Sequence, residues 1–378
     1  MMNTEQRAWL RLMATPRVGN STARKLLSVL GSPEAVVQAS FETLQGLVGA
    51  PLASALREVP ERFDTLLVQT ESWLTESPDR HLVPLGSPHY PQALLDMADP
   101  PLLLHVMGQL SILNHPRKVA MVGSRNPTPQ GKENARAFAQ TLSDAGVCVV
   151  SGLALGIDGA AHQGSLQGAM GGIAVVGTGL DRVYPKAHHA LAHALAQNGA
   201  LVSEYLMGTG PLPGNFPKRN RIIAGLSQAT LVVEATLDSG SLITANLANE
   251  MGRDVLAIPG SIHAPQSKGC HSLIRQGAKL VESARDVLED LQVQPPLFSV
   301  DEVKGTHEGT GSQHVTSGTT TPRCPVLQAL GYDPVSLDEL QARTGLDTPA
   351  LQARLWELEM QGCLNRLPGG WFQQAAMA

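Results

Sequence analysis

Short apolar runs alternate with amphipathic stretches from about residue 80 to residue 290. The runs are rich in Val, Ile, Leu and Ala, and glycine turns separate them from stretches with helical spacing. Apolar strands that alternate with helices are typical of a parallel sheet covered on both faces. We therefore predict a doubly wound, mostly parallel α/β domain over residues 80–291. Its nine strands are expected at residues 81–85, 102–107, 118–122, 147–150, 172–176, 200–204, 230–234, 254–258 and 279–281. Helices are expected between them at 130–145, 157–166, 188–197, 219–226, 242–251 and 271–276.

The first 75 residues have a purely helical pattern. Two similar helix–loop–helix stretches occupy residues 10–32 and 41–58, each with a glycine turn between apolar-periodic segments. In the second, the letters GLVG at 46–49 have the form of a helix-hairpin-helix turn, whose amides suit phosphate. In the first, Arg17 stands where a glycine is expected. We predict a sterile-alpha-motif-like or helix-hairpin-helix domain over residues 1–75, which binds a ligand or merely packs.

The last part of the chain changes character twice. Residues 293–325 are poor in apolar residues and rich in Gly, Ser and Thr, which predicts a flexible linker. Residues 326–378 read as three helices and a β-hairpin that turns at Pro-Gly-Gly, which is a winged-helix pattern. This segment has three Arg, no Lys and six Asp or Glu, a net charge of −3, and its third helix includes Glu357 and Glu359. Such a surface repels a phosphate backbone, so we favour a protein-binding or regulatory role.

Composition sets the class of protein and of site. The 378 residues are 43% hydrophobic, enough for two or three domains with buried cores. No segment reaches the length needed to span a bilayer and the first residues lack a signal-peptide pattern, so we expect a cytoplasmic protein without membrane contact. Four distant cysteines indicate neither a disulfide framework nor a zinc site. With a net charge of −5, any site for a polyanion must be local.

The loops that follow the predicted strands are the candidate site, because ligands of open parallel sheets bind beyond the carboxyl ends of the strands. After residues 118–122 comes GSRNPT, which is not a dinucleotide-binding GxGxxG turn. Its Arg125, next to Ser124, has the charge and shape to bind a phosphate. The loops after the next two strands contain Gly152 and Gly177, which allow close approach of a ligand to the backbone.

The segment PGNFPKRNR at residues 213–221 is the richest candidate. Grooves that hold single-stranded nucleic acid combine cations that meet phosphates with aromatic rings that stack on bases. Only 4% of the chain is aromatic, so a phenylalanine among cations is informative. Because Phe216 precedes Pro217, we expect it on a loop. A basic helix start with a core phenylalanine is the alternative. The candidate residues are Phe216, Lys218, Arg219, Asn220 and Arg221.

Two further loops carry polar groups suited to an anion. Ser239, Gly240 and Ser241 precede a predicted helix, where two hydroxyls and free amides form a nest for an oxyanion. An ordinary helix cap needs only one of these serines. Lys268, at the start of another predicted helix, is a second-tier candidate for phosphate.

Several other groups receive less weight. Asp158 and His162 share a helix face, as an acid–base pair or, more commonly, as a hydrogen-bonded structural pair. His188, His189 and His193 include an i, i+4 pair without a third metal ligand. Neither GxSxG, a Walker A motif nor HExxH occurs. We therefore predict no catalytic residue, no metal site and no cofactor.

Seven motifs resemble, in order, the bacterial DNA-processing protein A family, also called DprA or Smf. They are VGSRNPT, SGLALGIDGAAHQGSL, GTGLDRVYP, SEY, NFPKRNRIIAGLS, EATLDSGSLITANLANEMGRDVLAIPGS and SKGCHSLIRQGA. The resemblance implies an extended Rossmann-like domain that binds single-stranded DNA without known catalysis and forms homodimers. It also implies help in loading a RecA-type recombinase during natural transformation. The family's DNA pocket falls on Arg125, Phe216, Lys218, Arg219 and Arg221, with Gly152, Gly177, Ser239 and Ser241 at its rim.

Three functions follow as hypotheses. The first is a single-stranded DNA-binding protein, with duplex binding left open. The second is a Rossmann-like nucleotide N-glycosidase, in which the loop at residues 234–244 holds a ribose phosphate beside a carboxylate. The third is an interaction scaffold with vestigial loops.

Overall fold

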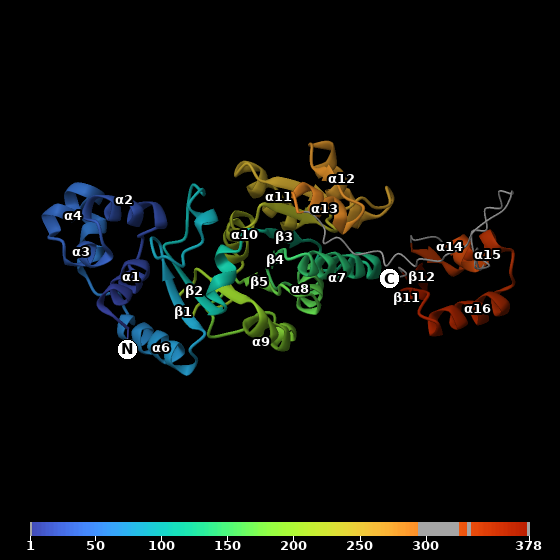
Figure 1. Cartoon of the computed structure of the whole chain (residues 1–378), viewed down its shortest axis with the longest axis horizontal. Helices are drawn as coiled ribbons and strands as arrows, with labels where there is room; N and C mark the ends of the chain where they lie inside the picture. The colour runs from blue at the N-terminus through green and yellow to red at the C-terminus, as the bar shows by residue number, and fades with distance from the viewer. Residues whose placement is uncertain (1, 294–324, 331–333, 376–378) are drawn as a thin grey trace, which may run out of the picture. The chain divides into compact units, whose positions relative to one another are not determined.

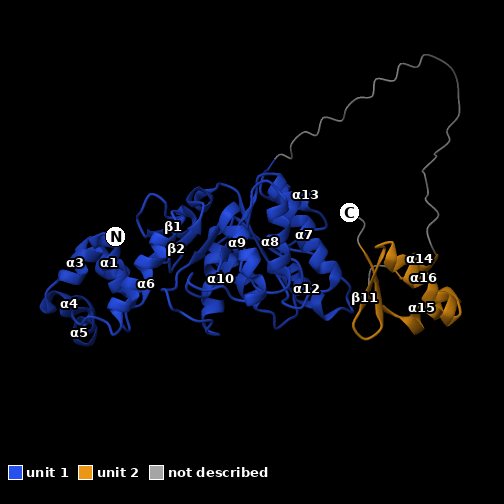
Figure 2. Cartoon of the chain, turned by 90° about the horizontal axis from the view of Figure 1, so that it is seen from below, with its two compact units in different colours: residues 1–294 blue, residues 295–378 orange. Residues whose placement is uncertain are grey.

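The chain forms two compact units, residues 1–294 and 295–378 (Figure 2). The structure, a computed structural model, describes residues 2–293, 325–330 and 334–375. The predicted linker at 293–325 lies outside the described residues except for its two ends. Across the described ranges, every helix is too short or too polar to cross a lipid bilayer.

A nine-stranded sheet organises the first unit (Figure 1), and all nine predicted strands are confirmed within two residues at each end. Its order is β1-β2-β6-β5-β4-β3-β7-β8-β9. The strands from β6 to β9 in this order are parallel, whereas β2 pairs antiparallel with both β1 and β6. Their bounds are β1 (Arg80–Pro84), β2 (Leu103–Gly108), β3 (Lys118–Val122), β4 (Cys148–Ser151), β5 (Gly172–Val175), β6 (Ala200–Ser203), β7 (Ala229–Val232), β8 (Asp254–Ala257) and β9 (Lys279–Leu280).

Helices cover both faces of this sheet because alternate strand residues point to opposite sides. Val119 and Met121 of β3 pack with one group of helices, and Ala120 and Val122 pack with the other. The first group is α7 (Pro129–Asp144), α8 (Ile157–Gln167) and α13 (Ala284–Asp290). The second is α10 (Asn215–Leu226), α11 (Gly240–Glu250) and α12 (Lys268–Arg275), while α9 (His189–Asn198) packs with the N-terminal helices. The sequence thus predicted the doubly wound arrangement correctly.

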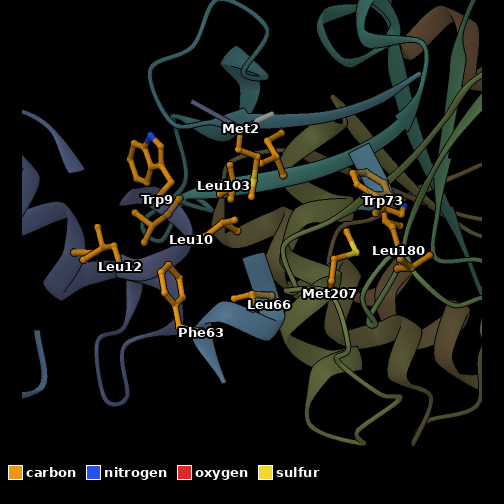
Figure 3. Close-up of a cluster of buried hydrophobic side chains, with 14 of the residues drawn as sticks. Met2, Trp9, Leu10, Leu12, Phe63, Leu66, Trp73, Leu103, Leu180 and Met207 are labelled. Atoms are coloured by element: carbon orange, nitrogen blue, oxygen red, sulfur yellow. The ribbon is translucent and has the colours of Figure 1, made fainter. Parts of the chain in front are cut away.

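Helices also fill residues 2–79 before the first strand: α1 (Thr4–Ala14), α2 (Asn20–Leu30), α3 (Pro33–Gln38), α4 (Phe41–Val48), α5 (Ala50–Arg57) and α6 (Phe63–Glu76). Their apolar faces share one core with the sheet. Figure 3 shows Trp9 and Leu10 of α1 with Leu103 of β2, and Trp73 of α6 with Met207. The N-terminal helices are therefore joined to the α/β part within one compact unit.

The turns between the N-terminal helices differ from one sequence prediction and show why Arg17 stands at a position where glycine is expected. Gly46 and Leu47 lie inside α4, so the predicted GLVG turn is wrong; the chain turns at Gly49, with a φ of 82°. Arg17 has a φ of 67°, the left-handed conformation in which a glycine is expected. Its guanidinium donates to the carbonyl of Pro51 at 3.3 Å. Arg17 is thus held in a structural contact between the two helix pairs.

An ionic network also connects the N-terminal helices to the sheet. Arg24 of α2 donates to Asp99 at 2.8 Å and to the carbonyl of Ala98 at 2.8 Å. Arg221 of α10 donates to the carbonyl of Asp99 at 2.8 Å and pairs with Glu204, which follows β6. Breaking one partner of such a buried pair is costly, so this network fixes the start of α10 beside the strand ends.

The second unit is a winged helix. Three helices, α14 (Pro325–Leu330), α15 (Leu337–Thr344) and α16 (Thr348–Met360), bury a small apolar core. Strands β10 (Val335–Ser336), β11 (Leu364–Leu367) and β12 (Trp371–Gln374) form an antiparallel sheet in the order β10-β12-β11. The β11–β12 hairpin turns at Pro-Gly-Gly, as the sequence predicted.

Candidate nucleic-acid interface

The order of the strands reverses at β3, which pairs with β4 on one side and β7 on the other. Ligands of open α/β sheets bind at this point, beyond the carboxyl ends of the strands. The loops after β3 and β7 are tied together: Ser124 donates its N–H to the carbonyl of Glu234 at 2.7 Å. The Glu234 carboxylate accepts from the Thr128 N–H at 2.9 Å and from its hydroxyl at 2.5 Å. The Thr128 hydroxyl also caps α7.

An open groove of about 700 Å³ lies at these strand ends. Eight of the thirteen predicted site residues line it: Ser124, Arg125, Phe216, Arg219, Asn220, Ser239, Gly240 and Ser241. They come from three places in the sequence, the loop after β3, the start of α10 and the segment at the start of α11. The expectation that these loops converge is therefore correct.

Arg125 and Phe216 lie side by side in the lining of the groove. Arg125 is exposed, and its guanidinium carbon lies 5.8 Å from the centroid of the Phe216 ring, a cation–π contact. Phe216 is half-buried, and it lies in the first turn of α10 rather than on a loop. That prediction was wrong because a proline is tolerated in the first turn of a helix, where its missing N–H has no partner to lose. The ring and the cation nevertheless both reach the groove.

Arg219 and Arg221 do not lie open at the surface, contrary to the sequence prediction. Arg219 is 4% exposed, and its Nη1 donates to the carbonyl oxygens of Gly152 at 2.5 Å and of Val175. Burial lowers the pKa of Arg219 to about 10, so it stays charged at neutral pH. Arg221 is 9% exposed and engaged with Glu204. A buried guanidinium needs acceptors for its N–H groups, and Nη atoms of both arginines donate to acceptors inside the protein.

Two glycines make room for these side chains rather than for a ligand alone. A Cβ on Gly152 would lie 2.3 Å from Nη1 of Arg219, and one on Gly177 would lie 3.2 Å from the Phe216 ring. Gly177 also accepts a 3.0 Å hydrogen bond from Asn215 at the start of α10. Both glycines thus leave space for side chains that line the groove, although the glycines themselves do not line it.

The start of α11 supplies hydroxyls. The Ser239 and Ser241 hydroxyl oxygens lie 2.6 Å apart, and Ser239 accepts from the Ser241 N–H at 3.4 Å. Asn220 of α10 donates to the carbonyl of Gly240 at 3.4 Å, which joins the two helix starts. The two predicted serines therefore meet at one edge of the groove, where the positive end of α11 favours an anion.

Two predicted lysines differ in position. Lys218 is exposed in the first turn of α10, two residues from the Phe216 ring. Lys268 begins α12, and its ammonium donates to the carbonyl of Ile262, outside the groove lining. Lys218 is the better candidate for phosphate.

Asp158 and His162 do not form the pair that their spacing predicted. Asp158 accepts from the N–H groups of Gly152 at 3.1 Å and Ala154 at 3.3 Å. Burial raises the pKa of Asp158, and the charge of Arg219 opposes that shift. His162 is completely buried, and burial together with the charge of His188 lowers its pKa to about 3.

His162 gives a pH-dependent stability that can be measured. Its neutral form is favoured in the fold, so below pH 6.5 the unfolded chain takes up a proton that the folded chain refuses until about pH 3. Relative to His162→Leu, the wild-type free energy of unfolding should therefore fall by about 2 kcal/mol between pH 7 and pH 5. Urea unfolding of both proteins at each pH checks this, and the subtraction cancels the carboxylates. If the free energies of unfolding of the two proteins changed equally with pH, the pKa of His162 would not be lowered in the fold.

Tyr184 lines the groove but was not among the predicted site residues, although it follows the GTGLD turn after β5. Its ring centroid lies 5.6 Å from that of Phe216. The signal was present, because a Tyr-Pro pair after a strand-end turn places an aromatic ring at the same edge of the sheet.

Comparison with known proteins places the chain in a family. The family model for DNA recombination-mediator protein A matches residues 81–292, and the model for the DprA winged-helix domain matches residues 313–370. The chain belongs to the DprA family. The fold and the seven motifs found in the sequence agree with this assignment.

Individual DprA relatives cover most of the chain. Protein Smf of Escherichia coli strain K12 is 43% identical over 300 residues, covering 79% of this chain and 78% of that protein. The X-ray structure of DNA processing protein A from Streptococcus pneumoniae is 37% identical, with a TM-score of 0.64 over 76% of this chain and 98% of that one. DNA processing protein A from Helicobacter pylori, described by its single-stranded DNA binding mode, is 31% identical, with a TM-score of 0.52 over 56% of this chain and 96% of that one.

Proposed function

We propose that this DprA protein binds single-stranded DNA in the groove at the strand ends. The observation that carries the proposal is the exposed Arg125 guanidinium over the Phe216 ring, at the point where the strand order reverses. A cation and an aromatic face side by side suit a phosphate and its neighbouring base. The single-stranded DNA binding described for the Helicobacter pylori relative supports the same ligand.

Titration with fluorescently labelled dT oligomers at 50 mM and 200 mM salt tests this function. Binding should be tight at low salt and should weaken several-fold at high salt, because each neutralised phosphate releases counterions. Oligomers of dA and dC should bind within a few-fold of dT, since stacking and phosphate contacts tolerate any base. Absence of binding at 50 mM salt would leave the scaffold hypothesis in its place.

We also propose that the site is not catalytic. The N-glycosidase hypothesis needs a free carboxylate of the loop at 234–244 in the groove. Both oxygens of Glu234 accept hydrogen bonds from Thr128, and Asp238 is exposed outside the groove lining. Burial raises the pKa of Glu234, and these bonds oppose the shift. Incubation with nucleoside monophosphates should release no free base, and release would favour the enzyme.

The family resemblance supports a finer proposal. We propose that the protein acts in the cytoplasm during natural transformation, protects incoming strands and helps to load a RecA-type recombinase. A homodimer would put two grooves on one particle and increase avidity for long strands. Light scattering that finds monomers at micromolar concentration would remove the dimer from this scheme.

The winged helix is expected to contribute little to single-strand binding. Helix α16 has two carboxylates, Glu357 and Glu359, and one cation, Arg354, which pairs with Glu357 at 2.5 Å. This helix therefore offers no net positive charge to a phosphate backbone. We expect removal of residues 325–378 to change the affinity for a dT oligomer by less than twofold. A tenfold loss, measured with the same titration, would instead assign DNA contacts to this unit.

A further inference from the structure

Tyr184 differs from the other tyrosines that the structure describes. Tyr90 is buried and donates its hydroxyl to the carbonyl of Pro101 at 2.7 Å, and Tyr205 donates to the carbonyl of Asn215 at 3.0 Å. Tyr184 is 47% exposed. Within residues 2–293, the exposed aromatic side chains are Phe41, far away on α4, and Tyr184, which lines the groove. An exposed ring at a groove is a candidate contact with a ligand.

The rings of Tyr184 and Phe216 are placed to act separately. Their centroids are 5.6 Å apart and their planes are tilted by 42°. Aromatic rings whose centroids are roughly 4.5–7 Å apart are in direct contact, which leaves no room for a base between them. The two rings are too close and too tilted for such a sandwich. A base that stacks on Tyr184 must therefore use the exposed face of that ring alone.

The edge of the groove at the start of α11 is polar. Ser239 and Ser241 contribute hydroxyls, and α11 begins there with its amides directed outward. One part of the groove thus suits bases and another suits phosphates. A flexible strand can satisfy both only if its bases turn toward the rings.

We propose that Tyr184 is a second base-stacking residue, which takes the base next to the one on Phe216. The inference rests on the proposed function and adds to it: the groove binds two successive nucleotides with their bases turned inward. Tyr184 should therefore not increase the affinity for a DNA strand that lacks bases.

The test uses three variants of the full chain, Tyr184→Leu, Tyr184→Phe and Phe216→Leu, and two labelled oligomers, dT and an abasic strand of equal length. Tyr184→Leu fills similar space without a π face, so we expect dT affinity to fall about 5- to 20-fold. Tyr184→Phe keeps the face and should stay within twofold of wild type. For the abasic strand, all variants should match wild type.

A 2-aminopurine base in the dT strand gives an independent readout. Stacking quenches its fluorescence, and Tyr184→Leu should reduce the quenching at saturating protein. If Phe216→Leu weakens dT binding while Tyr184→Leu does not, this inference fails and the proposed function stands. If wild type binds neither strand, the proposed function itself fails. Equal losses on dT and the abasic strand would make Tyr184 a structural residue of its loop.

Discussion

Replacing Arg125 and Phe216 together by alanine is expected to lower affinity for a dT oligomer about 100-fold at 50 mM salt. Stacking on a single aromatic ring contributes about 1–3 kcal/mol, and a charge-assisted hydrogen bond contributes about 1.5–3 kcal/mol. The two side chains touch, so their losses should not add fully. The single Arg125→Ala variant should lose at least several-fold, and the slope of log affinity against log salt should fall by about 0.7.

A matched control exists on the same unit. Arg285 of α13 is an exposed arginine paired with Glu289, and Phe41 of α4 is an exposed phenylalanine. The double variant Arg285→Ala/Phe41→Ala removes the same two side-chain types away from the groove. It should bind dT within twofold of wild type. Equal losses in both double variants would mean that the groove has no special role.

The Arg219→Ala variant is expected to lose about 3 kcal/mol or more of unfolding free energy. It removes the Arg219 donor from the buried carbonyls of Gly152 and Val175, and it removes from Asp158 the stronger of two positive neighbours, the other being Arg125. Each unsatisfied buried group costs about 1–3 kcal/mol. Urea unfolding followed by circular dichroism measures the change, with Arg125→Ala as a control that should shift by less than about 0.5 kcal/mol because its side chain is exposed.

The opposite result would also be informative. If Arg219→Ala kept wild-type stability and lost only DNA affinity, its guanidinium would be a direct contact that leaves the interior on binding. The sequence prediction that Arg219 contacts DNA would then be right. The interpretation of its guanidinium as a structural group of the interior would be wrong.

The sequence was sufficient for the sheet because its strands are apolar on both faces. Runs such as KVAMV and GIAV can be buried only between two layers of helices, and the glycine loops mark where each strand ends. Ligands of such sheets bind at the carboxyl ends of the strands. This rule predicted that Arg125, Phe216 and Ser239 line one groove, as they do.

Local sequence patterns could not predict hydrogen bonds between residues far apart in the chain. Arg219 is held by carbonyls 67 and 44 residues away, and Arg221 by the carbonyl of Asp99, 122 residues away. Nothing in the letters KRNR distinguishes these buried cations from the exposed Lys218. Trp9 and Leu103 belong to one core. Local patterns could not predict this either, because it depends on how the N-terminal helices pack on the sheet.

Photocrosslinking locates the DNA most directly. A dT oligomer that carries 5-iododeoxyuridine at one position is irradiated in complex with the full chain, and the attached peptide is identified by mass spectrometry. We predict attachment within residues 124–128, 182–186, 215–221 or 239–244, with Phe216 and Tyr184 as the preferred points. Attachment confined to the N-terminal helices or to α14–α16, with none at the strand ends, would contradict the proposed groove.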